Sequence, residues 1–407
     1  MPVAQAVANA ADEGRPLNFG FSASWTQARA LAHIGTLPVP DVHASMDILA
    51  DPQWQRSSSR AERRRWLGLL EDELAAGALG IGVLMGYAPG SDPDEYLDVA
   101  RLAARAHTPT FTHVCELMEA NPRTPIDGSE ELLRAAAETG AAMHHCHVNS
   151  TSLRHIDRVL AQVERTQAAG SRVTVEAYPY GAGSTAIGAS FLAPDKLPGL
   201  GITPSSLVIT ETGERIADET RLREIQRTAP GAACIVNWLD ESDPLDREHL
   251  KRSLSFPGAI VASDAMPVLW PSGGIELAVY EQAEWPLPPG GQTHPRTAGT
   301  FTKSIRLMVR ESDSWTWLEA FRRCSYLPAR VLDETAPTMR GKGRLAAGAD
   351  ADVVVLDPAA ITDRATYEDP TRPAQGVRHL FVNGTAVVRD GRMQVDAFPG
   401  RAVLGRP

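Results

Sequence analysis

The feature that most constrains this chain is the alternation of short apolar runs with helical patterns. We expect seven of these runs to form buried strands, at residues 17–25, 79–87, 108–116, 141–148, 172–180, 232–238 and 258–264. Near-continuous apolar runs are typical of parallel strands that are covered on both faces. Helical patterns lie between them, at 57–77, at 129–140 with a predicted start at Ser129, and from Ser152 to Gly170. This alternation predicts a parallel α/β sheet or barrel.

The pattern changes near residue 341. The segments that follow have no helical period, and Asn383-Gly384 between two apolar runs is a hairpin signal. A length of 407 residues suits one large α/β barrel with a smaller satellite. We therefore expect an α/β unit over residues 1–340 and a small β unit over 341–407.

Charge and composition argue against several classes of protein. The net charge of −10 disfavours binding to nucleic acid or to a membrane surface, since both favour basic faces. No run of 18 apolar residues predicts a transmembrane helix, and the first residues lack the basic start of a secretory signal. The four cysteines are scattered without a CxxC pair, at 115, 146, 234 and 324. Reduced thiols in a cytoplasmic protein are the resulting expectation.

Histidines and one aspartate stand where predicted strands end. His113 ends one run, His145 and His147 end the next, and Asp264 ends the run that begins at residue 258. Carboxyl ends of parallel barrel strands converge on one face, so these side chains are expected at one mouth. Imidazole and carboxylate are ligands that hold zinc and leave a position open for water. The pattern favours hydrolysis by a metal-activated water, with a carboxylate that carries the proton.

Each of these residues also has an ordinary structural interpretation. A lone strand-end histidine such as His113 is more often hydrogen-bonded than metal-bound. His145 and His147 are two residues apart, so on a strand they would face the same side, and His144 would then face the helices. Asp264 alternatively caps a following helix.

Two further motifs suggest a bound ligand. The segment from Tyr178 to Thr185 is expected to end a strand in a Gly-rich loop that approaches a ligand closely, although it lacks the phosphate-loop pattern. Arg296, within His294-Pro-Arg296, lies in a Pro-rich loop. Its guanidinium suits a bidentate clamp on a carboxylate, and a surface arginine is the alternative.

The order of these motifs is specific. It comprises Thr112-His113-Val-Cys-Glu116, His145-Cys-His147, Tyr178-Pro-Tyr180 with Gly183-Ser184-Thr185, Ser263-Asp264, His294-Pro-Arg296 with Gly299-Thr-Phe301, Gly343 to Asp352, and Val382-Asn-Gly384. In this order the chain resembles the D-aminoacylase family (N-acyl-D-amino-acid deacylases) of the amidohydrolase superfamily. Its N-acyl-D-glutamate deacylase branch is the most similar, and the resemblance covers nearly the whole chain.

The resemblance implies a distorted β/α barrel with a β-sandwich built from both chain ends. It implies metal binding by His113 and His147, with His145 as the alternative ligand, and a catalytic role for Asp264. We expect the metal to be zinc, at one ion per chain.

The same resemblance implies the residues that hold the substrate, a small N-acyl amino acid. Tyr178, Ser184 and Arg296 match residues near the substrate carboxylate and the scissile amide. Asn149 stands where the family has a lysine, so it is assigned to substrate binding as well.

The chain departs from the family at its start. The family opens with His-x-His on the first strand and has a bridging Cys or Glu on the second, and neither is found before residue 17. We therefore expect an incomplete (β/α)8 barrel of about six strands that begins in the helix before the third. Its exposed edge strand at 17–25 favours low solubility or a homo-oligomer, and we expect little activity.

Two other functions compete with deacylation. One is hydrolysis of a cyclic amide, as in hydantoinase or dihydroorotase relatives, and the Tyr-Pro-Tyr and His-Pro-Arg motifs argue against it. The other is an inactive remnant that at most binds a small molecule. Metal content distinguishes these, because a remnant or binder need not hold zinc.

Overall fold

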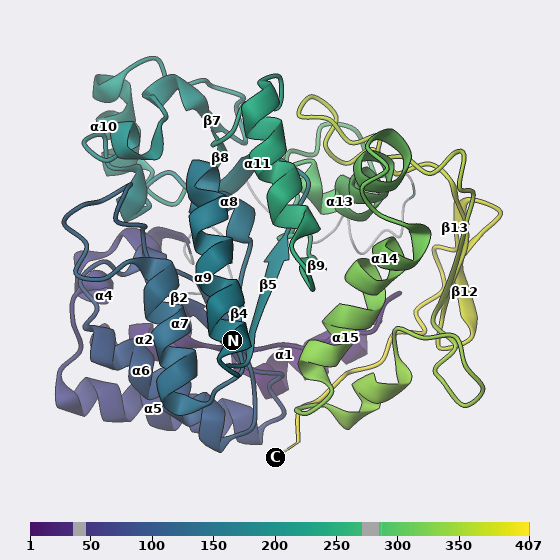
Figure 1. Ribbon diagram of the computed structural model, residues 1–407, viewed down its shortest axis with the longest axis horizontal. Coiled ribbons are helices and arrows are strands. Elements are labelled where there is room, and N and C mark those ends of the chain that lie inside the picture. Colours follow the sequence, from purple (N-terminus) through teal and green to yellow (C-terminus); the bar gives the residue numbers. More distant parts are fainter. Residues whose placement is uncertain (36–45, 271–284, 286, 407) are drawn as a thin grey trace.

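The computed structural model describes residues 1–35, 46–270, 285 and 287–406 (Figure 1). Within these residues the main sheet has six strands. They are β1 (Ala23–Ser24), β2 (Ile81–Leu84), β3 (Thr110–His113), β4 (Met143–His145), β5 (Val173–Ala177) and β9 (Ile260–Val261).

The main sheet is parallel throughout and runs in the order β1-β2-β3-β4-β5-β9. In its register Leu84 lies beside His113, and Thr112 lies beside His145, so the strands end at similar heights. The predicted α/β class and the expected six parallel strands are thus confirmed. The 17–25 run contributes the short strand β1 at one end of the order, as expected.

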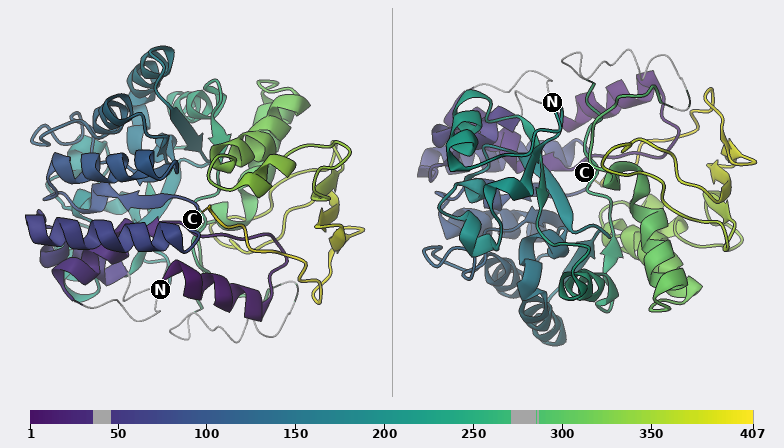
Figure 2. Two further views of the ribbon diagram at one scale, coloured as in Figure 1. Left: turned by 90° about the horizontal axis from the view of Figure 1, so that it is seen from below. Right: turned by 90° about the horizontal axis from the view of Figure 1, so that it is seen from above.

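Helices follow most of these strands and cover the outer face of the sheet (Figures 1 and 2). They are α2 (Trp25–His33), α5 (Arg60–Ala75), α6 (Pro93–Arg105), α7 (Gly128–Thr139), α9 (Ile156–Ala168) and α11 (Pro244–Ser255). The described part of the chain also contains α1 (Val3–Glu13), α4 (Pro52–Gln55), α8 (Val148–Ser152), α10 (Glu219–Thr228), α13 (Arg296–Ile305), α14 (Trp317–Phe321) and α15 (Leu327–Leu332).

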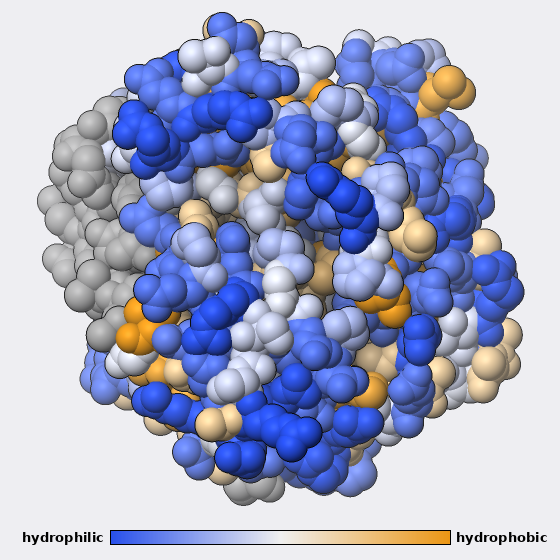
Figure 3. Space-filling model, turned by 90° about the vertical axis from the view of Figure 1, so that its left-hand side faces the viewer, coloured by the Kyte–Doolittle hydropathy of each residue, from blue (hydrophilic) through white to orange (hydrophobic). Residues whose placement is uncertain are grey.

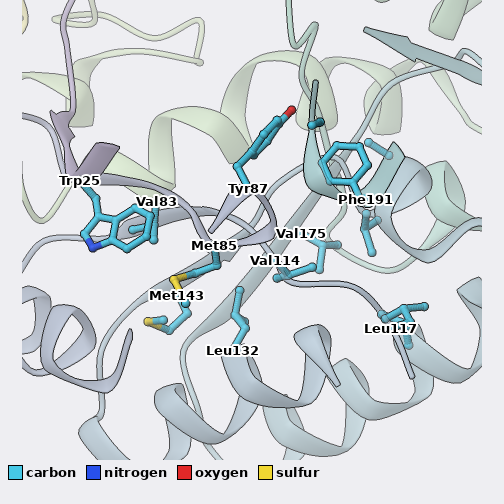
Figure 4. Close-up of a cluster of buried hydrophobic side chains, with 14 of the residues drawn as sticks. Trp25, Val83, Met85, Tyr87, Val114, Leu117, Leu132, Met143, Val175 and Phe191 are labelled. Atoms are coloured by element: carbon cyan, nitrogen blue, oxygen red, sulfur yellow. The ribbon is translucent and has the colours of Figure 1, made fainter. Parts of the chain in front are cut away.

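The core lies between the strands and the covering helices (Figure 4). Val83 of β2 and Trp25 and Leu132 of the helices are completely buried there, and Met143 is 1% exposed. Removal of these apolar side chains from water is the main force that holds the helices on the sheet.

Two predicted helices begin and end where polar side chains satisfy free backbone groups. Ser59 and Glu62 form a capping box at the start of α5, within the predicted 57–77 segment. Helix α7 ends at Gly140, which is left-handed as expected. Its N-cap, however, is Asp127 and not Ser129, because the Asp127 carboxylate accepts hydrogen bonds from the backbone at the helix start.

The helix expected from Ser152 to Gly170 is interrupted. Helix α8 ends at Ser152, Leu153 has a φ of 48°, and α9 begins only at Ile156. A leucine with positive φ cannot continue a right-handed helix.

A second sheet has the order β6-β8-β7 and contains β6 (Ala182–Ala186), β7 (Leu207–Ile209) and β8 (Ala233–Asn237). Both of its pairings are antiparallel. The 232–238 run was therefore correctly predicted as a strand but wrongly grouped with the parallel ones. A central antiparallel strand buried on both faces has the same continuous apolar pattern. The Gly183–Thr185 segment, predicted as a loop, forms part of β6.

The C-terminal strands form a four-stranded antiparallel sheet beside the main one (Figures 1 and 2). They are β10 (Val353–Leu356), β11 (Val377–Val382), β12 (Thr385–Arg389) and β13 (Arg392–Met393). The hairpin predicted at Asn383-Gly384 is confirmed. Both residues have positive φ, 48° and 82°, as a two-residue hairpin turn of this kind requires.

The two ends of the chain lie side by side. Phe19 forms a parallel bridge with Ala402 and exchanges backbone hydrogen bonds with residues 401 and 403. Asn18 donates to Asp352 over 3.0 Å, just before β10. The first residues of the chain therefore attach the C-terminal sheet to the main body.

One face of the molecule is mainly polar (Figure 3). Figure 3 shows a face on which hydrophilic side chains surround isolated hydrophobic ones. Among the described helices, none is long and apolar enough to cross a membrane.

Candidate active site

A cavity of about 320 Å³ opens where the strands of the main sheet end. Six of the eight predicted site residues line it: His113, His147, Tyr178, Ser184, Asp264 and Arg296. The other two, His145 and Asn149, are not in its wall. The strand ends therefore converge as the parallel topology requires.

Two imidazoles face each other in this cavity. His113 ends β3, and His147 follows β4 with a left-handed φ of 33°. The Nδ1 atom of His113 lies 3.1 Å from the Nε2 atom of His147. The other ring nitrogen of His147 lies 3.0 Å from the Ser150 hydroxyl, which orients the ring. Phe191 stacks on His113 at a centroid distance of 5.8 Å.

The cavity keeps the His113 imidazole neutral. Burial is the largest cause that lowers the pKa of His113 well below its ordinary value, and the neighbouring His147 and His145 lower it further. A buried imidazole near other histidines binds a proton poorly. The neutral form is the one that binds a metal.

His145 lies on the opposite side of the sheet from this pair. Its Nε2 atom is 3.1 Å from the Ser129 hydroxyl of α7, and burial lowers its pKa to about 4. The expectation that His145 and His147 share a side was wrong, since β4 ends at His145 and the left-handed φ of His147 interrupts the strand alternation. His145 is thus placed away from the cavity in which His113 and His147 meet.

His144 is turned inward, contrary to the sequence expectation that it faces the helices. Its Nε2 atom lies 2.9 Å from the Glu176 carboxylate, and its Nδ1 atom lies 2.7 Å from the Thr174 hydroxyl. Both partners belong to the neighbouring strand β5. Because His145 faces outward, its neighbour on the strand must face the sheet interior.

Asp264 comes three residues after β9 and has a φ of 47°. Its carboxylate forms an ion pair of 2.8 Å with Nη2 of Arg296. Residues 265–268 are not helical, so the alternative that Asp264 caps a following helix was wrong. The carboxylate is instead held at the cavity that contains the two histidines.

Arg296 is a buried cation with remaining hydrogen-bonding capacity. It is 1% exposed and is the first residue of α13, not part of a surface loop. Its guanidinium lies 4.6 Å from the centre of the Tyr178 ring. Its Nε atom has no hydrogen-bond partner within the described part of the chain. A buried donor of this kind, in a cavity wall, is suited to an anionic ligand.

Tyr178 and Ser184 also face the cavity. Burial raises the pKa of Tyr178, so its hydroxyl remains a hydrogen-bond donor at neutral pH. Ser184 lies on β6, and its neighbour Thr185 shares a hydrogen bond of 2.7 Å with Tyr87. The added antiparallel sheet thereby contributes one wall of the cavity.

Asn149 has a different position from the one expected of a substrate-binding residue. Its amide oxygen accepts a hydrogen bond from the Tyr178 backbone, and its amide nitrogen donates to the Tyr180 carbonyl. It is 3% exposed. These bonds hold the backbone of the segment that carries Tyr178. Asn149 therefore positions a residue of the cavity wall and does not line the cavity itself.

Sequence reasoning missed several residues that line the cavity, namely Tyr87, Arg154, Phe191 and Trp238. Tyr87 had a usable signal, because it ends the predicted strand 79–87, where parallel strands carry functional groups. Phe191 and Trp238 follow strands of the second sheet, whose pairing was not predicted. Arg154 lies in the helix interruption at Leu153.

Comparisons with known proteins show which family the chain belongs to. The Amidohydrolase family matches residues 292–388. The chain is 30% identical to N-acyl-D-aspartate deacylase of Alcaligenes xylosoxydans xylosoxydans over 408 residues, which cover 96% of this chain and 73% of that protein. It is 29% identical to N-acyl-D-glutamate deacylase of the same organism, over 85% of this chain. It spans 65% of that relative's length.

Solved structures give the same picture. N-acyl-D-glutamate deacylase from Bordetella bronchiseptica, complexed with zinc and a phosphonate inhibitor, is 25% identical and has a TM-score of 0.65. The likeness covers 92% of this chain and 78% of that one. The fold is that of an incomplete α/β barrel of the amidohydrolase type, with a cavity where its strands end. The chain belongs to the amidohydrolase family, within its group of N-acyl-D-amino-acid deacylases.

Proposed function

We propose that this chain is a metal-dependent deacylase that hydrolyses the amide of N-acyl-D-amino acids. One observation carries the proposal. The His113–His147 pair lies in the same cavity as Asp264 and the buried Arg296. That combination offers metal ligands, a proton carrier and an anion site to one small molecule.

The two histidines fit a zinc ion. Ligand nitrogens around a tetrahedral zinc lie about 3.3 Å apart, given the usual zinc–nitrogen lengths. The observed separation of 3.1 Å between His113 Nδ1 and His147 Nε2 is close to this value. A zinc ion there would make a bound water more acidic and would polarise the scissile carbonyl.

The protein side chains supply the rest of the reaction. The Asp264 carboxylate takes the proton of the attacking water and returns it to the leaving amine. The free Nε of Arg296 and the Tyr178 hydroxyl hold the substrate α-carboxylate, together with Ser184. Arg296 thus bridges the substrate and Asp264, and sets the distance between the anion site and the reacting amide.

An acidic substrate side chain is the finer part of the proposal. Arg154 brings a second guanidinium to the cavity wall, where it is paired with Asp246. The relatives named above act on N-acyl-D-glutamate and N-acyl-D-aspartate. N-acyl-D-glutamate is therefore the substrate that we propose for this chain.

The test is an assay of the zinc-loaded chain with N-acetyl-D-glutamate, N-acetyl-D-aspartate, N-acetyl-D-leucine and N-acetyl-L-glutamate. We expect hydrolysis of the D-compounds, with the acidic ones preferred, and none of the L-compound. Binding of a phosphonate analogue of N-acetyl-D-glutamate, measured by calorimetry, gives a second readout. Opening of hydantoin or dihydrouracil without cleavage of any N-acyl-D-amino acid would overturn the proposal in favour of a cyclic-amide hydrolase.

A further inference from the structure

Three side chains of metal-binding types meet inside the main sheet, apart from the histidine pair described above. His144 lies on β4, Cys146 directly follows that strand, and Glu176 lies on the neighbouring β5. One ring nitrogen, the sulfur and one carboxylate oxygen all lie within 4.8 Å of one another. Adjacent parallel strands in register bring them together, since His144 pairs with Thr174 and His145 with Val175.

We propose that His144, Cys146 and Glu176 bind a divalent cation of the zinc class, at a site separate from His113 and His147. Thiolate, imidazole and carboxylate are the three ligand types that zinc takes in proteins. Around a tetrahedral zinc such ligand atoms lie about 3.3–3.8 Å apart. His144 Nε2 and the Glu176 oxygen are 2.9 Å apart, and the whole cluster is within 4.8 Å, so side-chain shifts of less than about an ångström suffice.

The surroundings of His144 are those of a metal ligand. Its Nδ1 atom bonds to the Thr174 hydroxyl over 2.7 Å, which leaves Nε2 directed at Glu176. The Phe111 ring packs against the imidazole at 5.7 Å and limits its rotation. A hydrogen bond on the second ring nitrogen is the usual way in which proteins orient a ligating histidine.

The site is buried and yet open to an ion. The side chains of His144 and Glu176 are 3% and 17% exposed, and Glu176 forms an ion pair with His144. A cavity of about 410 Å³ is lined by Cys146 and Glu176, and other parts of its wall are formed by His113, His147 and Asp264, so an ion could reach either set of ligands from it. A cation that arrives through it would balance the buried carboxylate, whose isolated charge is otherwise costly.

This inference goes beyond the proposed deacylation and does not depend on it. The sequence led us to expect one zinc per chain, on the strand-end histidines. The inward orientation of His144 adds a second set of ligands, so the expected number becomes two.

Cobalt(II) titration of the metal-free full chain tests the proposal, because a thiolate ligand gives cobalt a near-ultraviolet charge-transfer band. We expect two bound ions and a clear band. Cys146→Ser should remove the band and one ion. Cys324→Ser is the matched control, as that cysteine is also partly buried and lies outside the cluster, and it should bind as the wild type does. Glu176→Gln should lower the affinity for one of the two ions. The loss should exceed the roughly tenfold to hundredfold that is typical when a residue outside the ligand set is changed.

The outcomes separate this site from the one at His113. His113→Gln should lose one ion but keep the band. If that variant binds like the wild type while Cys146→Ser loses the band, the cluster stands and the proposed deacylase site fails. Bound cobalt without a band in the wild type would overturn the proposal. Loss of both ions in Cys146→Ser would also overturn it, because the two sets of ligands would then not be separate sites. Should Cys146→Ser not fold, the wild-type band and its persistence in Cys324→Ser decide the question.

Discussion

The parallel main sheet and the C-terminal antiparallel sheet are built from similar apolar strands but bury them differently. Ile81 and Val83 of β2 are completely buried, whereas Val354 and Val355 of β10 are 49% and 43% exposed. Helices cover the outer face of the parallel sheet, and its strands all end on one side, where the cavity lies. Hairpins send successive C-terminal strands in opposite directions, so their ends do not converge.

This difference assigns separate tasks to the two regions. Chemistry and most of the stability should reside in the parallel sheet and its helices. Substitutions in the C-terminal sheet should be tolerated far better. Matched substitutions in the two regions test this assignment directly.

The largest expected difference concerns two aspartates with nearly the same backbone conformation. Asp264 at the cavity and Asp390 in the C-terminal sheet have φ values of 47° and 49°. Loss of a general base typically costs about 10²–10⁴-fold in rate. Asp264→Asn should therefore lower kcat/KM for N-acetyl-D-glutamate by that range, and Asp390→Asn should leave it unchanged. Equal effects would show that Asp264 is not the proton carrier.

Ion pairs in the two regions should differ nearly as much. Arg29 and Glu95 pair with both side chains fully buried, between α2 and α6, whereas the Arg378–Asp357 pair near the C-terminal sheet has side chains 60% and 28% exposed. Glu95→Ala leaves a buried guanidinium unpaired and should cost about 3–5 kcal/mol of unfolding free energy. Asp357→Ala should change the unfolding free energy far less, because water screens an exposed ion pair. Urea denaturation of both variants measures the two values.

A pH effect should also be confined to the main body. Burial raises the pKa of Glu131 on α7 to about 7, above its ordinary value, and a hydrogen bond with Cys115 opposes this only in part. The protonated form is thus favoured in the folded chain. The stabilisation is complete below the unfolded pKa and is lost as pH rises through about 7.

Glu131→Gln keeps a neutral side chain at every pH and should remove this dependence. The unfolding free energy of Glu131→Gln minus that of the wild type should therefore rise by up to about 3 kcal/mol from acidic to alkaline pH. Glu368 is exposed in the C-terminal region and serves as the control. Glu368→Gln should change the unfolding free energy by the same amount at acidic and at alkaline pH. If the difference in unfolding free energy between Glu131→Gln and the wild type did not change with pH, the raised pKa of Glu131 would be contradicted.

Arginines provide the next comparison. Arg296→Ala removes a charge-assisted hydrogen bond to the substrate carboxylate, which is typically worth about 1.5–3 kcal/mol. We expect mainly a higher KM, by roughly tenfold to a hundredfold. Arg378→Ala should leave KM as it is. An unchanged kcat/KM in Arg296→Ala would contradict the assignment of the anion site.

The smallest effect comes from the same substitution in two strands. Val83→Ala in the main sheet removes two buried methyl groups and should cost about 1.5–2 kcal/mol. Val354→Ala in the C-terminal sheet should stay within about 0.5 kcal/mol. Thermal unfolding of both variants would show whether the exposed strand is as tolerant as its burial indicates.

Much of this architecture was accessible from the pattern of residues. The strand–helix alternation predicted the parallel sheet, and Asn383-Gly384 predicted the C-terminal hairpin. The predictions that turned out wrong have a common cause. The 232–238 run and the orientation of His144 both depended on which strand or helix lies next to a residue, and one-dimensional patterns do not encode neighbours.

The sequence by itself determined which side chains are available and where along the chain each strand ends, because periodicity and apolar runs are local properties. It thereby indicated His113, His147, Asp264 and Arg296. The tertiary structure alone decided which of them meet. The left-handed φ of His147 interrupts the strand alternation, and that ring lies beside His113, whereas within β4 the alternation turns His145 to α7 and His144 to Glu176. A single backbone dihedral at a strand end decides on which side the side chains after it lie, and the packing of the whole sheet selects that dihedral.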